Sequence, residues 1–193
     1  MKVGILSLQG SFIDHAISVN KIGFDPIFIK KIDDLKKIDA LILPGGESTA
    51  MIKIDSYSNI FSELLILINK GIPTLTTCAG SILLAKQVIG GVVTLPLVDI
   101  QISRNAYGRQ VESFEGDVTF FDNNDIYCFI RAPKITKILH DSVQIIAKHN
   151  EEIVGVKQNN IISLTYHPEL TNDTYYLTWL KNFIKEGQYV RSF

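Results

Sequence analysis

Short apolar runs alternate with segments of helical periodicity over the first 90 residues, and this alternation restricts the possible folds more than any other feature. The apolar runs lie at residues 3–8, 26–29, 40–43 and 72–77. Helical periodicity is seen at residues 12–22, 57–69 and 79–89. Strands that are apolar on both faces and alternate with helices are typical of a parallel sheet covered by helices on each side. The first half therefore predicts an α/β fold.

The second half has a different pattern, in which short strand-like segments follow one another. These segments lie at residues 99–103, 117–121, 126–130, 143–148, 152–157 and 161–166. Turn signals at Asn123-Asn124 and Asn159-Asn160 indicate antiparallel additions, and a last helix is expected at 173–186. The whole pattern predicts a three-layer sandwich with a mostly parallel central sheet and helices on both faces. Because no repeat or linker interrupts the chain, we expect one domain over residues 1–193.

Charge and cysteine content narrow the class of protein. Nineteen basic and twenty acidic side chains give a net charge of -1, which favours neither a nucleic acid nor a membrane surface as partner. Two isolated cysteines indicate free thiols in a reducing compartment. The N-terminal apolar run is too short for a signal peptide or a membrane span. The sequence thus predicts a cytoplasmic protein without nucleic-acid or membrane partners.

Cys78 lies where the apolar run 72–77 meets a predicted helix, the arrangement of a nucleophile elbow. A helix N-terminus favours a thiolate, and the backbone N–H of Ala79 would face a developing oxyanion. Taken alone, a cysteine at a strand end is also typical of a core residue. Cys128 has no such setting and is expected in the core.

Two further segments are candidate partners of Cys78. His167 and Glu169 flank Pro168 and can present an imidazole base with an orienting carboxylate, although such a pair alone is also typical of a surface. The turn Pro44-Gly45-Gly46 follows another apolar run, and its glycines can direct amide groups toward a ligand. Gly46 is a candidate for the second oxyanion donor, and Ser48 or Thr49 for the cap of a following helix. The turn matches neither nucleotide phosphate-loop pattern.

Six motifs in the same order resemble the glutaminase subunits of pyridoxal 5'-phosphate synthase, a branch of the class I glutamine amidotransferases. They are Leu8-Gln9-Gly10, Pro44-Gly45-Gly46-Glu47-Ser48-Thr49, Thr77-Cys78-Ala79-Gly80, Arg104-Asn105-Ala106-Tyr107-Gly108-Arg109-Gln110, Phe129-Ile130-Arg131-Ala132-Pro133 and His167-Pro168-Glu169-Leu170-Thr171. The cysteine and histidine motifs are shared widely in the class, whereas the two arginine-containing stretches are specific to this branch.

The resemblance implies a triad of Cys78, His167 and Glu169. It also implies a set of glutamine contacts, namely Gly46, Glu47, Ser48, Arg104, Ile130 and Arg131. An arginine suits the α-carboxylate of L-glutamine, and Glu47 suits its α-ammonium group. The resemblance further implies that ammonia passes to a (β/α)8-barrel synthase subunit in a hetero-oligomer, and that this chain needs no cofactor.

One departure and several alternatives remain open. The elbow is usually written G-x-C-x-G, and Thr76 stands where the first glycine is expected, which makes the geometry of the elbow a question. The alternatives are a glutaminase of another synthase, such as that for imidazole glycerol phosphate, a non-catalytic binding module of the same fold, or a general cysteine hydrolase. The other three histidines, His15, His140 and His149, lack metal-ligand spacing, so no metal site is expected and each is predicted to be solvated or structural.

Overall fold

The computed structural model describes residues 1–104 and 113–189. Within these residues the central sheet has nine strands in the order β2-β1-β3-β4-β12-β11-β10-β7-β8. Its parallel half consists of β2 (Asp25–Ile29), β1 (Lys2–Leu6), β3 (Ala40–Leu43), β4 (Thr74–Thr77) and β12 (Ile161–Leu164). Its antiparallel half consists of β11 (Glu152–Gln158), β10 (Gln144–His149), β7 (Ser113–Phe120) and β8 (Asn123–Ile130). The predicted α/β fold, with a parallel sheet in the first half and antiparallel additions in the second, is confirmed, although the antiparallel part is as large as the parallel part.

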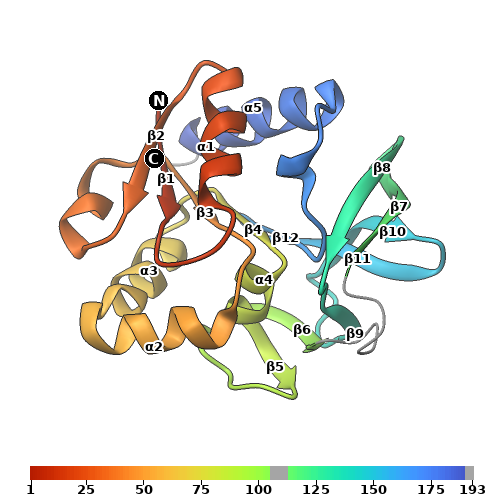
Figure 1. The fold of residues 1–193 in the computed structure, drawn as a ribbon, viewed down its shortest axis with the longest axis horizontal. Helices are drawn as coiled ribbons and strands as arrows, with labels where there is room; N and C mark the ends of the chain where they lie inside the picture. Colours follow the sequence, from red (N-terminus) through yellow and green to blue (C-terminus); the bar gives the residue numbers. More distant parts are fainter. Residues whose placement is uncertain (105–112, 190–193) are drawn as a thin grey trace.

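Helices cover both faces of the parallel half (Figure 1). On one face lie α1 (Phe12–Lys21) and α5 (Thr174–Tyr189), and on the other lie α2 (Ser48–Ser58), α3 (Ile60–Asn69) and α4 (Ala79–Leu84). A second sheet of β5 (Ala85–Ile89), β6 (Val98–Ser103) and β9 (Lys134–Ile138) lies below α4 in this view. Two short 3-10 helices, η1 (Ile32–Lys37) and η2 (Pro168–Leu170), complete the fold.

The inner strands of the parallel half, β1, β3, β4 and β12, are buried on both faces, which explains their largely continuous apolar sequence, whereas the edge strand β2 is partly exposed. In β3, Leu41 and Leu43 belong to the core that α3 and α4 help to form, whereas Ala40 and Ile42 belong to the core on the side of α1 and α5. Successive side chains of a strand point to opposite faces, so one four-residue strand serves two cores. No helix among the described residues is long and apolar enough to cross a membrane.

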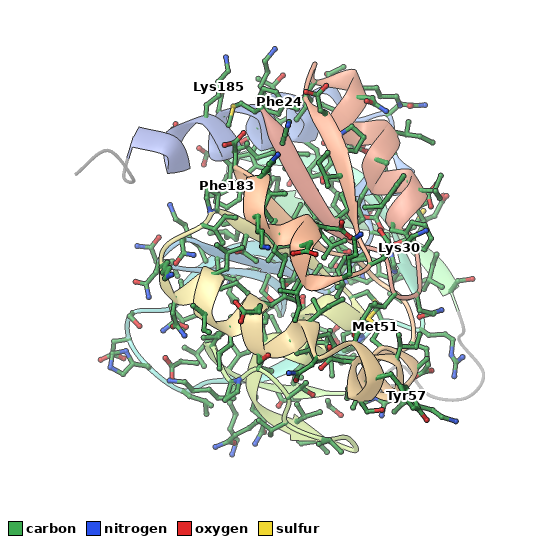
Figure 2. All side chains as sticks on the ribbon, turned by 90° about the vertical axis from the view of Figure 1, so that its left-hand side faces the viewer. Phe24, Lys30, Met51, Tyr57, Phe183 and Lys185 are labelled. Atoms are coloured by element: carbon green, nitrogen blue, oxygen red, sulfur yellow. The ribbon has the colours of Figure 1, made fainter. Side chains whose placement is uncertain are left out.

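The segment around residues 48–69 differs from the prediction of one helix over 57–69. It forms two helices, because Asn59 adopts a left-handed conformation (φ 52°) that ends α2 and starts α3. Tyr57 therefore belongs to α2, where it is 87% exposed, while Met51 of the same helix is buried (Figure 2). The cap of α2 is Glu47, whose carboxylate accepts from the N–H of Thr49, and not Ser48 or Thr49 as expected.

Three other local predictions are wrong. The helix expected over 79–89 ends at Leu84, because residues 85–89 pair with β6 as the parallel strand β5. The strand β9 was not predicted, since its sequence Lys-Ile-Thr-Lys-Ile has only two apolar residues and no regular alternation. The turn expected at Asn123-Asn124 lies two residues earlier at Phe121-Asp122, where Phe121 has φ 51°, and the two asparagines begin β8.

Candidate active site

Cys78 occupies a sharp turn between β4 and α4. Its backbone has φ 44° and ψ -106°, a left-handed conformation that residues with a side chain rarely adopt and that is concentrated at functional sites. The turn is held because the N–H of Cys78 donates to the carbonyl of Leu164 in β12, at 2.9 Å. Gly80 allows the helix to approach β3, since a Cβ at this position would lie 2.1 Å from the carbonyl oxygen of Leu43.

Thr76 fits the elbow in place of the usual glycine. Its side chain is fully buried in β4, and its Oγ1 lies 2.9 Å from Oγ of Ser81 in α4. Ser81 in turn donates to the carbonyl of Leu164 at 2.7 Å. The hydroxyl of Thr76 thus links β4 to α4 and β12 around Cys78. The side chain fits in the core, and its hydroxyl has hydrogen-bond partners there.

His167 and Glu169 are paired in the structure. Nδ1 of His167 lies 2.7 Å from Oε1 of Glu169, and both side chains are buried. The N–H of His167 donates to the carbonyl of Cys128 at 2.9 Å, which joins the histidine to the end of β8. Pro168 begins η2 directly after His167, and this single turn brings Glu169 back beneath the imidazole.

The charges of this pair stabilise each other against the cost of burial. Burial raises the pKa of Glu169, but the interactions with His15 and His167 outweigh it, so the pKa is lowered well below its ordinary value. Burial lowers the pKa of His167, yet the interactions with Cys78 and Glu169 outweigh it and raise that pKa. The site therefore favours a charged imidazole between a carboxylate and the thiol.

Cys78 and His167 face one cavity of about 310 Å³. The Cys78 thiol donates to the carbonyl of Ile130 at 3.7 Å, and Nε2 of His167 is buried without a hydrogen-bond partner among the described residues. The unpartnered Nε2 is thus available to a ligand in the cavity.

The predicted glutamine contacts line the same cavity. Its walls include Gly46, Glu47, Ser48, Arg104, Ile130 and Arg131, together with Gln9, Ser11, Gly45 and Ile82. Residues far apart in the sequence therefore meet at one cavity. Of the arginine stretch that begins at Arg104, residues 105–110 lie outside the described residues.

Charged groups stand opposite each other on the cavity wall. Arg104 donates from Nη2 to Oε1 of Glu47 at 2.9 Å. The hydroxyl of Thr49 contributes most to lowering the pKa of Glu47, and Arg104 and Arg131 lower it further. Arg131, like Cys78, has a left-handed backbone (φ 46°). The cavity thus offers both a carboxylate and guanidinium groups to a zwitterionic ligand.

The two glycines of the turn have different surroundings. The N–H of Gly45 donates to Oγ1 of Thr77 at 3.0 Å, and a Cβ at position 45 would lie 2.2 Å from Cε1 of His167. Because its amide is already engaged, Gly45 is not the oxyanion donor in this arrangement. Gly46 lines the cavity and remains one candidate donor, and Ala79, fully buried at the start of α4 directly after Cys78, remains the other.

The SNO glutamine amidotransferase family matches residues 5–188. The chain belongs to this family. It is 42% identical over 189 residues to the pyridoxal 5'-phosphate synthase subunit PdxT of Methanocaldococcus jannaschii, an alignment that covers 96% of this chain and all of the relative. It is 43% identical over 185 residues to the protein of the same name in Pyrococcus abyssi, covering 90% of this chain and 94% of the relative. The resemblance seen in the six motifs is confirmed.

Solved structures agree with this membership of the SNO glutamine amidotransferase family. A crystal structure of a glutamine amidotransferase superposes with a TM-score of 0.88 at 34% identity, covering 95% of this chain and 98% of that one. The structure of PurLQS from Thermotoga maritima superposes with a TM-score of 0.67 at 15% identity, covering 100% of this chain and 99% of that one. The second likeness concerns the fold alone.

Some residues of the site in this member of the SNO family were not predicted. His15, expected to be either solvated or structural, is fully buried, and its Nε2 lies 3.0 Å from Oγ1 of Thr77 and 3.3 Å from Oε1 of Glu169. Ser11 donates to the same carboxylate oxygen at 2.9 Å. The sequence signal for Ser11 and His15 is weak, and consists only of their position shortly after the Leu8-Gln9-Gly10 motif.

Two other groups complete the description of the site. Gln9 accepts from the N–H of Glu47 at 2.6 Å and so holds the glycine turn. Cys128, which was expected in the core, is only half-buried. Among the described residues, no group of three or more His, Cys, Asp or Glu side chains is arranged to hold a metal ion.

Proposed function

We propose that this chain hydrolyses L-glutamine to L-glutamate and ammonia, with Cys78 as nucleophile, His167 as acid and base, and Glu169 as the carboxylate that orients His167. One observation carries the proposal: a cysteine with a left-handed backbone faces the same cavity as a histidine whose Nδ1 lies 2.7 Å from a buried carboxylate. This combination supplies a nucleophile, a base and an orienting group, as thiol acyl transfer requires.

The reaction proceeds in two halves. The Cys78 thiolate attacks the side-chain amide carbon, and the N–H groups of Ala79 and Gly46 stabilise the resulting oxyanion. When the C–N bond breaks, His167 gives its proton to the leaving ammonia, and a glutamyl thioester remains. Water then attacks the thioester carbon while His167 takes a proton from it, and the C–S bond breaks to release glutamate and the thiol. Each oxyanion donor is expected to lower the barrier by about 3–4 kcal/mol.

The cavity wall fits the two charged ends of the substrate. Arg104 and Arg131 are suited to the α-carboxylate of glutamine, and Glu47 is suited to the α-ammonium group. Gly46, Ser48 and Ile130 add contacts along the same wall. The ion pair between Arg104 and Glu47, at 2.9 Å, positions the guanidinium group and the carboxylate at the cavity wall.

The proposal extends to a partner. The relatives from Methanocaldococcus jannaschii and Pyrococcus abyssi are named as subunits of pyridoxal 5'-phosphate synthase, which supports a synthase subunit of (β/α)8-barrel fold as the acceptor of ammonia. This chain then acts in a hetero-oligomer in the cytoplasm, and its two free cysteines agree with a reducing compartment.

Two alternatives make different predictions. A glutaminase of another synthase, such as that for imidazole glycerol phosphate, would be stimulated by that synthase and not by the pyridoxal 5'-phosphate synthase subunit. A non-catalytic binding module drew its support from Thr76, and the satisfied position of that side chain beside Ser81 removes this support.

A glutaminase assay with and without the cognate synthase subunit tests the proposal. We expect wild-type protein to release glutamate and ammonia in the complex, and the Cys78→Ala variant to lose this activity while still binding glutamine. Cys128→Ala, which removes the thiol outside the cavity wall, is the matched control and should remain active. Glutamate release by Cys78→Ala would overturn the assignment.

A further inference from the structure

A second histidine lies beside the carboxylate of Glu169. His15 belongs to α1, is fully buried, and places Nε2 3.3 Å from Oε1 of Glu169. Ser11, at the start of the same helix, donates to this oxygen at 2.9 Å, and His167 contacts it at 2.7 Å. Three groups therefore contact one carboxylate oxygen, and two of them come from α1 and its N-cap residue Ser11.

The surroundings of His15 determine which ring nitrogen carries the proton. Oε1 of Glu169 belongs to an ionised carboxylate and only accepts, so the contact at 3.3 Å is favourable only if Nε2 of His15 carries a hydrogen. Nδ1 of His15 has no partner among the described residues, and a buried N–H without an acceptor would be costly. We therefore assign the hydrogen to Nε2 from these contacts.

Thr77 extends the contact to the glycine turn. Its Oγ1 lies 3.0 Å from Nε2 of His15 and accepts from the N–H of Gly45 at 3.0 Å. Thr77 directly precedes Cys78, and Gly45 lies against the ring of His167. A single ring nitrogen thus bridges the carboxylate of the triad and the strand end that carries the nucleophile.

We propose that His15 is a positioning residue of the triad, whose Nε2–H holds the Glu169 carboxylate and the Thr77 hydroxyl in one arrangement. This inference rests on the proposed glutaminase function. His15 is absent from the cavity wall, so it does not contact glutamine. It acts by keeping Glu169 aligned with His167 through both proton transfers, and its loss therefore lowers kcat with little effect on KM.

The test compares substitutions at position 15 in the complex with the synthase subunit. His15→Leu removes the donor and keeps an apolar side chain in the space. We expect kcat to fall about 10- to 100-fold, because small misalignments of catalytic groups have effects of this size, with KM changed by less than about 3-fold. His15→Gln places an amide N–H near the position of Nε2 and should restore kcat to within about 5-fold of wild type.

Ser18→Ala is the matched control for a change inside α1. Ser18 is buried in the same helix and donates to the carbonyl of Asp14, away from Glu169. Its removal should leave kcat and KM unchanged. Circular dichroism and thermal unfolding establish that each variant is folded. If His15→Leu does not fold, His15→Asn replaces it, because the shorter amide cannot reach Glu169 and should fail where His15→Gln succeeds.

A double variant tests whether His15 acts through Glu169. If it does, combining His15→Leu with Glu169→Gln should slow the reaction by no more than about 2-fold beyond Glu169→Gln alone, whereas independent effects would multiply. If the reductions in kcat of the two single variants multiply in the double variant, His15 does not act through Glu169. Equal reductions in kcat in His15→Gln and His15→Leu would likewise show that His15 does not position the triad. Folded His15→Leu with wild-type kcat would overturn the inference alone. Wild-type protein without glutaminase activity would overturn the proposed function as well.

Discussion

Glu169 is a carboxylate that the fold buries completely and surrounds with His15, His167 and Ser11. Burying a charge is expensive unless it is paired and hydrogen-bonded, so these contacts stabilise the folded protein as well as the ionised form. At the scale of single residues, the chemistry of the site and the stability of the fold therefore depend on the same few atoms.

The pH dependence of stability should reveal this buried charge. The pKa of Glu169 in the folded state is lowered from an ordinary value of 4.5, so its contribution to stability is present above that pH and is lost as the pH falls toward the folded-state pKa. In Glu169→Gln, the loss of unfolding free energy between about pH 6 and about pH 3 should be smaller than in wild type by on the order of 1–3 kcal/mol.

Urea unfolding at a series of pH values measures this difference. Glu63→Gln, which removes an exposed carboxylate of α3, is the control and should follow the wild-type curve. An unchanged slope in Glu169→Gln would show that the buried carboxylate is not the source of the acid lability.

Arg104 gives a second prediction at this scale, because it lies on the cavity wall and not beside the thiol. Replacing Arg104 with Met removes a charged hydrogen-bond donor to the substrate, so KM for glutamine should rise about 10- to 100-fold while kcat changes by less than about 3-fold. Lys86→Met in β5, which removes a cation outside the cavity, is the control. Steady-state kinetics at saturating synthase subunit distinguish the two parameters, and a fall in kcat with unchanged KM would contradict the assigned role.

At the scale of elements, the junction of β4 and α4 determines the backbone geometry of Cys78. Thr76 in β4 and Ser81 in α4 share a hydrogen bond, and both contact the backbone of β12. Thr76 therefore holds β4, α4 and β12 together through hydrogen bonds of its side chain, whereas a glycine at this position would allow close packing of the backbone. The left-handed backbone of Cys78 depends on these three elements remaining together.

Restoring the usual glycine at position 76 should destabilise the protein. Thr76→Gly removes a buried hydrogen bond and a buried methyl group and loosens a strand, which together should lower the free energy of unfolding by about 2–4 kcal/mol. Thr76→Ser, which keeps the hydroxyl, should lose about 1 kcal/mol. Chemical unfolding at neutral pH provides the comparison, and a Thr76→Gly variant as stable as wild type would contradict the packing argument.

The elements that the sequence predicted correctly are those whose own pattern determines them. β3 and α1 have unbroken apolar or helical periodicity and form as expected. Residues 85–89 form a strand only because β6 lies beside them, a contact that no local pattern contains. The site shows the same division: the motifs predicted Cys78, His167 and Glu169, whereas His15 joins them only through the packing of α1 on η2.

At the scale of the whole molecule, the cavity lies where the two halves of the chain meet. Cys78 and the glycine turn come from the parallel half, and Ile130 and Arg131 come from the end of β8 in the antiparallel half. A partner that covers this boundary would close the cavity against water. Ammonia would then leave toward the partner and not into solution.

Isotope labelling tests this handover of ammonia. In a complex supplied with amide-¹⁵N glutamine and excess unlabelled ammonium, pyridoxal 5'-phosphate should carry ¹⁵N with little dilution, as measured by mass spectrometry. With Cys78→Ala in the complex, the product should instead carry unlabelled nitrogen from the medium. Full dilution of the label in the wild-type complex would show that ammonia is released into solution first.

The place of β12 in the sheet has a consequence for synthesis of the protein. β12 lies between β4 and β11, although β4 is made much earlier in the chain. Until the ribosome has delivered β12, β4 has an open edge and Cys78 lacks the carbonyl of Leu164 that holds its turn. His167 and Glu169 emerge later still. A nascent chain therefore carries Cys78 without the contacts that hold its turn, and without His167 and Glu169, until residues 161–169 have been made.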